Sequence, residues 1–68
     1  MNSKEQFGKK LMELRKNKNL TQANLAELAG LDRPYISGIE QGKRNVSLEV
    51  IAKLADALEI EIKEFFEE

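Results

Sequence analysis

The stretch "TQANLAELAGLDRPYISGIEQGK", residues 21–43, contains two short helical patterns separated by a turn signal. The first pattern carries the apolar residues Leu25, Ala26, Leu28 and Ala29. Thr21 precedes it as a favourable N-cap, and Gly30 ends it because glycine readily adopts the left-handed conformation that closes a helix. Only residues 30–32 separate the two patterns, and two short helices joined so tightly predict a helix-turn-helix. A short turn containing glycine also occurs in many other helical bundles.

The second pattern, about residues 33–41, has one apolar side and one side of small or polar residues. On a helical wheel Tyr35, Ile36 and Ile39 fall on the apolar side, and Gly42 closes the helix. The other side carries Arg33, Pro34, Ser37, Gly38 and Gln41. A merely solvated helix would carry Glu, Lys and Ala there. Short side chains instead let the helix approach another surface, so this side is a candidate binding face.

Two starts are open for this second helix, because Pro34 disfavours a helical conformation in the residue before it. Either Asp32 is the N-cap, with its carboxylate accepting the Tyr35 amide, or Arg33 is the cap and Pro34 the first helical residue. We favour Asp32. In both cases Arg33 projects from the helix start, where a guanidinium can donate two hydrogen bonds to guanine O6 and N7.

The rest of the chain also has apolar residues at helical spacing, which predicts an all-α fold, a compact five-helix bundle. We expect a first helix at about residues 4–17, a fourth after Ser47 and a short fifth at about 62–67. Glu61 stands where a better cap would be expected before the fifth helix. We expect one domain over residues 1–68, with the helix-turn-helix helices at about 22–29 and 33–41.

Composition excludes several classes of function. The 68 residues contain neither cysteine nor histidine, which removes disulfides, thiolate metal sites, the usual zinc ligands and the commonest acid–base catalyst. We therefore expect no enzyme, metal or cofactor, and no small-molecule ligand. No apolar run approaches the roughly 18 residues of a membrane span, and the N-terminus is polar. A cytoplasmic protein with no membrane partner is the expectation.

The net charge of −1 hides an uneven distribution along the chain. Residues 1–20 carry six Lys or Arg and two Glu, whereas residues 59–68 carry five Glu and one Lys. The body of the chain through Leu58 has a net charge of +3, which is compatible with nucleic-acid binding. Phosphate could be held at the start of the helix after Thr21 and Gln22, and by the loop residues Lys43, Arg44 and Asn45. The plainer interpretation of these loop charges is solvation.

The stretch "LTQANLAELAGLDRPYISGIEQGKRNVSLEVIAKLADALEI" resembles the Cro/C1-type, or Xre, family of helix-turn-helix regulators from bacteria and phages. The resemblance covers about residues 7–66 and depends on the combination of TQ, LA, AG, YIS, IE and G. Within the family, "LDRPYISGIEQGKRN" is most similar to controller proteins of restriction–modification systems. The resemblance implies a lambda-repressor-like DNA-binding domain that places its third helix in the major groove.

The resemblance also implies roles for individual residues. Base contacts are expected at Arg33, Pro34, Ser37 and Gly38. Contacts to the DNA backbone are expected by resemblance at Gln22, Tyr35, Lys43, Arg44 and Asn45. We also expect them at Thr21, from its place at a helix start, and at Gln41. Arg15 and Glu40 match a salt bridge that joins the first and third helices, and the plainer interpretation is an exposed pair. Pro34 lies where relatives often carry threonine or a polar residue, and Gly38 has no side chain, so base reading depends mainly on Arg33.

A single recognition helix contacts too few base pairs to select one site. Each base pair contributes roughly 1–3 kcal/mol, against about 10⁶ or more competing sites. We therefore expect a homodimer that reads a palindromic operator with half-sites about 34 Å apart. Its interface would be formed by Ile60, Ile62, Phe65 and Phe66, unless Phe65 and one isoleucine merely complete the core.

The sequence therefore predicts a sequence-specific, dimeric transcriptional regulator whose partners are double-stranded DNA and a second copy of itself. The alternative is a protein-interaction module of the same fold, antitoxin-like or coactivator-like. Such a module would have an exposed apolar groove and would not depend on the basic residues of the third helix.

Overall fold

The computed structural model describes residues 3–67, which form four α-helices followed by one 3-10 helix. The elements are α1 (Ser3–Asn17), α2 (Gln22–Ala29), α3 (Arg33–Glu40), α4 (Leu48–Leu58) and η1 (Ile62–Phe66). Residues 3–67 contain no strand, which confirms the all-α fold. The prediction of a fifth α-helix is wrong, because residues Ile62–Phe66 form a 3-10 helix. No helix within the described residues is long and apolar enough to cross a membrane.

The 3-10 conformation of η1 follows from its length. Five residues are too few for a stable α-helix, and 3-10 geometry is common in such short pieces. Its first turn is closed by a bond from the Glu64 N–H to the Glu61 carbonyl at 3.0 Å. The Glu64 carboxylate also accepts the Glu61 N–H at 2.9 Å, so the start of η1 is capped without a serine or threonine.

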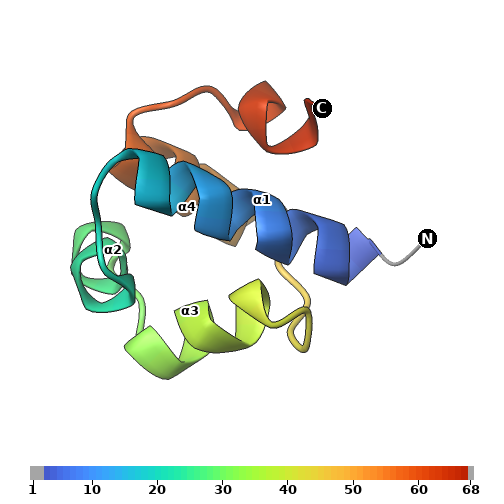
Figure 1. The fold of residues 1–68 in the computed structure, drawn as a ribbon, viewed down its shortest axis with the longest axis horizontal. Coiled ribbons are helices and arrows are strands. Elements are labelled where there is room, and N and C mark those ends of the chain that lie inside the picture. Colours follow the sequence, from blue (N-terminus) through green and yellow to red (C-terminus); the bar gives the residue numbers. More distant parts are fainter. Residues whose placement is uncertain (1–2, 68) are drawn as a thin grey trace.

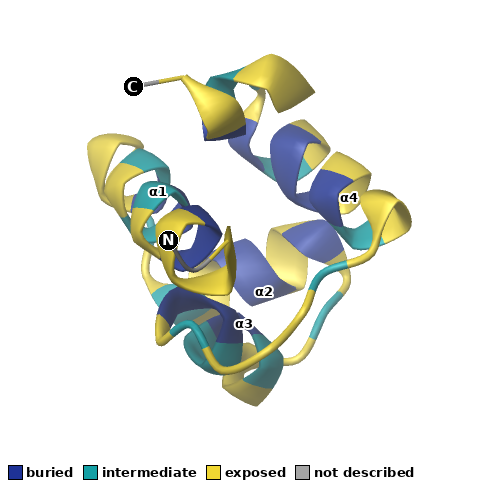
Figure 2. Ribbon diagram, turned by 90° about the vertical axis from the view of Figure 1, so that its right-hand side faces the viewer, coloured by how far each residue is buried: buried dark blue, intermediate teal, exposed yellow. Residues whose placement is uncertain are grey.

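The helices surround one core, with α1 across its middle (Figure 1). α2 and α3 lie below α1 in this view, and η1 lies on the opposite side of α1 from α3. The buried sides of the helices face inward (Figure 2). The core comprises Phe7, Leu11, Leu25, Ala26, Ala29, Ile36, Ile39, Ile51, Leu54, Ala55, Leu58 and Phe65. Leu28, although part of the apolar pattern of α2, is 60% exposed and lies outside it.

The ends of α2 follow the sequence signals closely. The Thr21 hydroxyl accepts the Asn24 N–H at 3.0 Å, and the Asn24 side chain accepts the Thr21 N–H at 3.2 Å. This capping box confirms Thr21 as the N-cap, with asparagine in the position where Glu or Gln is usual. At the other end Gly30 has a φ of 69°, the left-handed conformation that its position predicts.

The start of α3 agrees only in part with the expectation. Asp32 occupies the N-cap position with an extended backbone, and Pro34 is the second helical residue. The prediction that the Tyr35 amide donates to the Asp32 carboxylate is wrong, because the Asp32 side chain makes no capping bond. The Tyr35 N–H instead donates to the Asp32 carbonyl at 3.1 Å. Gly42, with a φ of 75°, follows the end of α3.

A buried salt bridge joins α1 to α3. Arg15 Nε donates to Glu40 Oε2 at 2.7 Å, and its terminal nitrogens donate to Glu40 Oε1 and to the Leu20 carbonyl. Gln22 of α2 donates to Glu40 Oε1 at 2.9 Å. The bond to Glu40 raises the pKa of Arg15 above its ordinary value, so the charged form persists throughout the neutral range. The stability that this raised pKa contributes is present at neutral pH and is lost as the pH rises through the pKa of Arg15.

Gly8 allows α1 to approach the end of α3 closely. A Cβ atom at this position would overlap the backbone carbonyl oxygen of Ile39 and lie 3.0 Å from that of Glu40. Backbone atoms cannot move aside as the end of a flexible side chain can. The absence of a side chain at position 8 therefore sets the distance between α1 and α3.

We expect Gly8→Ala to destabilise the fold by about 1–3 kcal/mol, since the added methyl must push the two helices apart. The loss would outweigh the better helix propensity of alanine. Urea denaturation followed by circular dichroism measures the change. Lys9→Ala, at the exposed neighbouring position, is the control and should change stability by less than about 0.5 kcal/mol. Equal stability of Gly8→Ala and the native chain would contradict the close approach.

Arg15→Leu should cost about 3–5 kcal/mol, because it leaves the Glu40 carboxylate buried without its cation. The double variant Arg15→Leu, Glu40→Leu should cost less than the sum of the two single variants. Thermal denaturation of all four proteins gives this coupling. Lys10→Ala, which breaks a more exposed pair with Glu13 at 3.7 Å, is the control, with an expected cost of about 0–1 kcal/mol. Additive single losses would show that the two groups do not act as a pair.

Candidate nucleic-acid interface

Helix α3 has one side in the core and one side facing outward. Ile36 and Ile39 are 0% and 1% exposed, so they hold the helix against the other elements. The five residues of the expected binding face lie on the outward side. Arg33, Pro34 and Gln41 are exposed, and Ser37 and Gly38 are half-buried. The face predicted from the helical wheel is therefore an accessible surface of the folded chain.

The position of α3 is fixed at its C-terminal end as well as by its apolar side. Glu40, its last residue, is bound by Arg15 of α1 and Gln22 of α2. Gly8 brings α1 against the carbonyl groups of the same turn. Because the buried groups that hold α3 lie on its inner side, these bonds do not occupy the outward side chains.

Two polar side chains near the C-terminal end of the outward face are bonded to each other. Gln41 Nε2 donates to the Ser37 hydroxyl oxygen at 2.8 Å, across one turn of the helix end. The bond leaves the Ser37 hydroxyl hydrogen and the Gln41 amide oxygen for other partners. The pair thus presents one donor and one acceptor side by side, the kind of group that reads a base edge or holds a phosphate.

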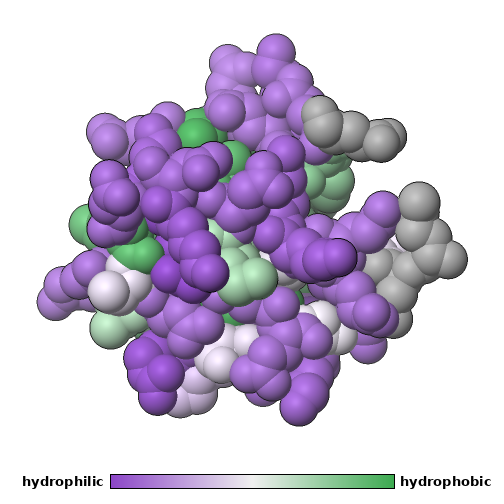
Figure 3. Space-filling model, viewed as in Figure 1, coloured by the Kyte–Doolittle hydropathy of each residue, from purple (hydrophilic) through white to green (hydrophobic). Residues whose placement is uncertain are grey.

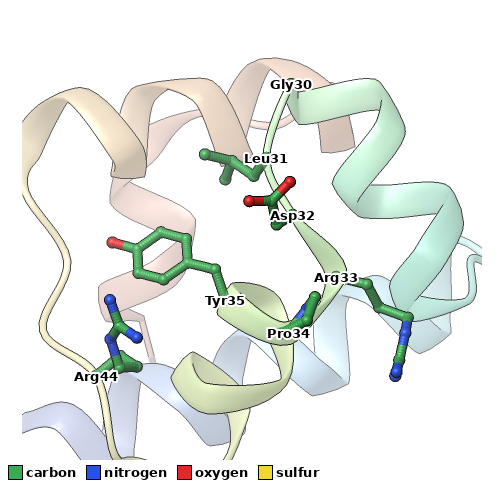
Figure 4. Close-up of a pocket in the computed structure, with 7 residues that line it drawn as sticks. All are labelled: Gly30, Leu31, Asp32, Arg33, Pro34, Tyr35 and Arg44. Carbon is green, nitrogen blue, oxygen red and sulfur yellow. The ribbon is translucent and has the colours of Figure 1, made fainter.

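Two arginines flank the start of α3. Figure 4 shows Arg33 projecting from the helix start on one side, while Arg44 lies beside the ring of Tyr35 on the other, with Pro34 between them. These residues line an open hollow together with Gly30, Leu31 and Asp32. Asp32 is the acidic side chain in this hollow, and its carboxylate is exposed and makes no capping bond.

The loop between α3 and α4 adds further cations to the same region. Lys43, Arg44 and Asn45 are all exposed. The carbon of the Arg44 guanidinium lies 4.9 Å from the centre of the Tyr35 ring, a cation–π contact, and the Tyr35 hydroxyl donates to the Asn45 carbonyl at 3.2 Å. The sequence suggested that these residues share a region but did not reveal that Arg44 packs on α3.

The start of α2 differs from the expected phosphate site. Thr21 is exposed, but its hydroxyl and its N–H are both used in the capping box with Asn24. Gln22 is half-buried, and its amide nitrogen donates to Glu40 rather than outward. The structure therefore places the Gln22 side chain in the network that holds α3. Sequence spacing alone could not distinguish this role from a phosphate contact.

The four residues of the expected dimer interface separate into buried and exposed groups. Phe65 is 3% exposed and packs on Phe7 with a distance of 4.9 Å between ring centres, so it belongs to the core of its own chain. Ile60 is half-buried against the same core. Ile62 and Phe66 remain 44% and 65% exposed. The prediction that Phe65 is an exposed residue of the dimer interface is therefore wrong. The exposed apolar patch at this end of the chain consists of Ile62 and Phe66.

This C-terminal patch and the outward face of α3 lie on different sides of the molecule. In both ribbon views η1 is at the top and α3 at the bottom, and Figure 1 shows α1 running between them. The face seen in Figure 3 is largely hydrophilic, with hydrophobic residues in small separate patches rather than in one groove. No cluster of potential metal ligands occurs among residues 3–67. Contact through η1 would leave α3 uncovered.

Comparisons with known proteins agree with this geometry. The family model described as Helix-turn-helix matches residues 11–65. Control protein C.MunI of Mycoplasma sp is 48% identical over 64 residues, which cover 93% of this chain and 86% of the relative. Control protein C.BamHI of Bacillus amyloliquefaciens is 44% identical over 62 residues, which cover 90% and 76%.

Solved structures give the same result. The crystal structure of the restriction-modification controller protein C.AhdI from Aeromonas hydrophila superposes with a TM-score of 0.94 at 53% identity, covering 97% of this chain and 100% of that one. The wild-type restriction-modification controller protein C.Esp1396I gives a TM-score of 0.86 at 33% identity, covering 93% and 83%. The chain therefore belongs to the Cro/C1-type helix-turn-helix family, within which it is similar to restriction–modification controller proteins.

Proposed function

We propose that this chain regulates transcription by binding double-stranded DNA with α3 in the major groove. The observation that carries the proposal is the outward face of α3, where Arg33 stands at the helix start beside a stripe of short side chains. A helix with such a face can approach base edges, and Arg33 can donate to guanine O6 and N7. Pro34 offers an apolar contact to a thymine methyl group.

The cations around this face supply contacts to the DNA backbone. Lys43 and Arg44 are exposed in the loop after α3, close to the end of the same helix. Contacts to phosphate position a protein on the duplex, whereas contacts to bases select the sequence. The two kinds of contact predict different outcomes when single residues are removed, so they can be separated by experiment.

The chain acts as a symmetric homodimer on a palindromic operator. One outward face offers too few base contacts to select a site, and a two-fold dimer doubles them. The exposed side chains of Ile62 and Phe66, on the opposite side of α1 from α3, support pairing through η1. Glu61 and Glu67 are exposed beside these side chains, on the side away from the DNA.

We expect Arg33→Ala to change which sequences are bound, and Lys43→Ala to weaken binding to all sequences about equally. Selection from a random duplex library, followed by titration at several salt concentrations, measures both effects. Loss of the Lys43 contact should reduce the slope of log Kd against log salt by about one. Unchanged sequence preference in Arg33→Ala would contradict base reading by this residue. Absence of any DNA binding by the native chain would favour a protein-interaction module.

Phe66→Ala should leave the fold intact and weaken self-association, since its ring is largely exposed in the single chain. Phe65→Ala is the matched comparison and should destabilise the fold by about 3–5 kcal/mol, because it empties a core position. Sedimentation equilibrium measures association, and thermal denaturation measures stability. A sedimentation profile unaffected by Phe66→Ala would remove η1 from the proposed interface.

A further inference from the structure

We propose that Gly38 and Tyr35 are positioning residues for Arg44, which they hold against α3 so that its guanidinium is in place before DNA arrives. The inference rests on the proposed DNA-binding function and assigns Gly38 a role different from the expected base contact. Three observations carry it: the space above Gly38, the ring of Tyr35, and the bond that fixes the loop.

The first observation is that the Arg44 side chain occupies the space that a side chain at position 38 would take. A Cβ atom on Gly38 would lie 2.6 Å from Arg44 Cγ and 3.5 Å from Cδ. Real Cβ atoms do not approach other carbons as closely as 2.6 Å. Any residue other than glycine at position 38 would therefore force the aliphatic part of Arg44 away from the helix.

The second observation concerns the charged end of the same side chain. The Arg44 guanidinium carbon lies 4.9 Å from the centre of the Tyr35 ring. Stacking on an aromatic ring favours this position for a guanidinium while leaving its N–H groups free to donate outward. Gly38 thus accommodates the aliphatic part of Arg44, and Tyr35 holds its charged end.

The third observation is the bond between Tyr35 and the loop. The Tyr35 hydroxyl donates to the carbonyl of Asn45, the residue after Arg44, at 3.2 Å. The backbone carrying Arg44 is therefore joined to the same ring that contacts its guanidinium. A long arginine side chain normally loses rotamer freedom when it binds, and part of this entropy loss already occurs in the free protein.

The result is a pair of guanidinium groups on opposite sides of the helix start. Arg33 projects freely from α3, whereas Arg44 comes from the following loop and lies against the ring of Tyr35 (Figure 4). In the proposed complex Arg33 reads bases and Arg44 binds a phosphate at the edge of the same groove. The distance between these two contacts is then set by Tyr35 and Gly38.

The contact can be tested without DNA, by nuclear magnetic resonance. Tyr35 is one of only four aromatic residues, besides three Phe, and the chain contains no Trp. Its ring should shift the Arg44 side-chain protons upfield. We expect Gly38→Ala and Tyr35→Leu to reduce these shifts strongly, and Tyr35→Phe, which keeps the ring but loses the bond to Asn45, to reduce them less. Unchanged shifts in Gly38→Ala would overturn the proposal.

The effect on DNA binding is tested with a four-protein cycle: native, Gly38→Ala, Arg44→Ala and the double variant. The probe is a duplex that the native chain selects from a random library, titrated at several salt concentrations. Loss of one charge-assisted contact corresponds to roughly a tenfold weakening. We expect about this loss for Gly38→Ala when Arg44 is present, and less than a twofold effect when position 44 is already alanine.

The alternatives give different results. If the added methyl of Gly38→Ala simply clashed with DNA, it would weaken binding equally in both backgrounds, and this outcome would overturn the positioning role. Alanine is the better helix former, so a thermal denaturation midpoint at or above the native value shows that Gly38→Ala folds. If the native chain selects no duplex at all, the proposed function fails, whereas the magnetic-resonance result still reports whether Arg44 is held.

Discussion

The position of α3 in the fold depends on the buried bond between Arg15 and Glu40. This bond connects the last turn of α1 to the last turn of α3, and Gln22 of α2 also donates to Glu40. Charged groups are costly to bury, so the three side chains must keep one arrangement to remain bonded. The apolar contacts of Ile36 and Ile39 hold α3 in the core, and the polar network adds directional bonds to Glu40 at the last turn of the helix.

Close backbone approaches define the remaining geometry. Gly8 lets α1 lie against the carbonyl groups at the end of α3, and Gly38 leaves room for Arg44 on the outer side of the same helix. The two glycines therefore act on opposite sides of α3. Gly8 sets how closely α3 packs against α1, and Gly38 leaves the exposed face of α3 open to the Arg44 side chain.

Features that depend on neighbouring residues, such as helix caps, could be predicted from the sequence. Features that depend on contacts between different helices could not. The Thr21 cap and the left-handed Gly30 follow from neighbouring residues, and both are present. The fifth segment has helical spacing, but it is only five residues long and forms a 3-10 helix. Adjacent Phe65 and Phe66 look equivalent in the sequence. Both rings contact Phe7, at 4.9 and 6.1 Å between ring centres, and only the folded chain shows that Phe65 is buried while Phe66 is 65% exposed. Likewise, only the folded chain shows Gln22 bonded to Glu40.

The burial of Phe65 within its own chain has a consequence for how occupancy of an operator would respond to protein concentration. Because this ring packs on Phe7 of the same chain, its burial does not require a second copy, whereas in an obligate dimer the core is completed only by the partner. Under the proposed pairing through Phe66, folded monomers and dimers are in equilibrium. The concentration of dimers then rises with the square of the monomer concentration. Binding to a palindrome would increase more steeply with the amount of protein than binding by a permanent dimer.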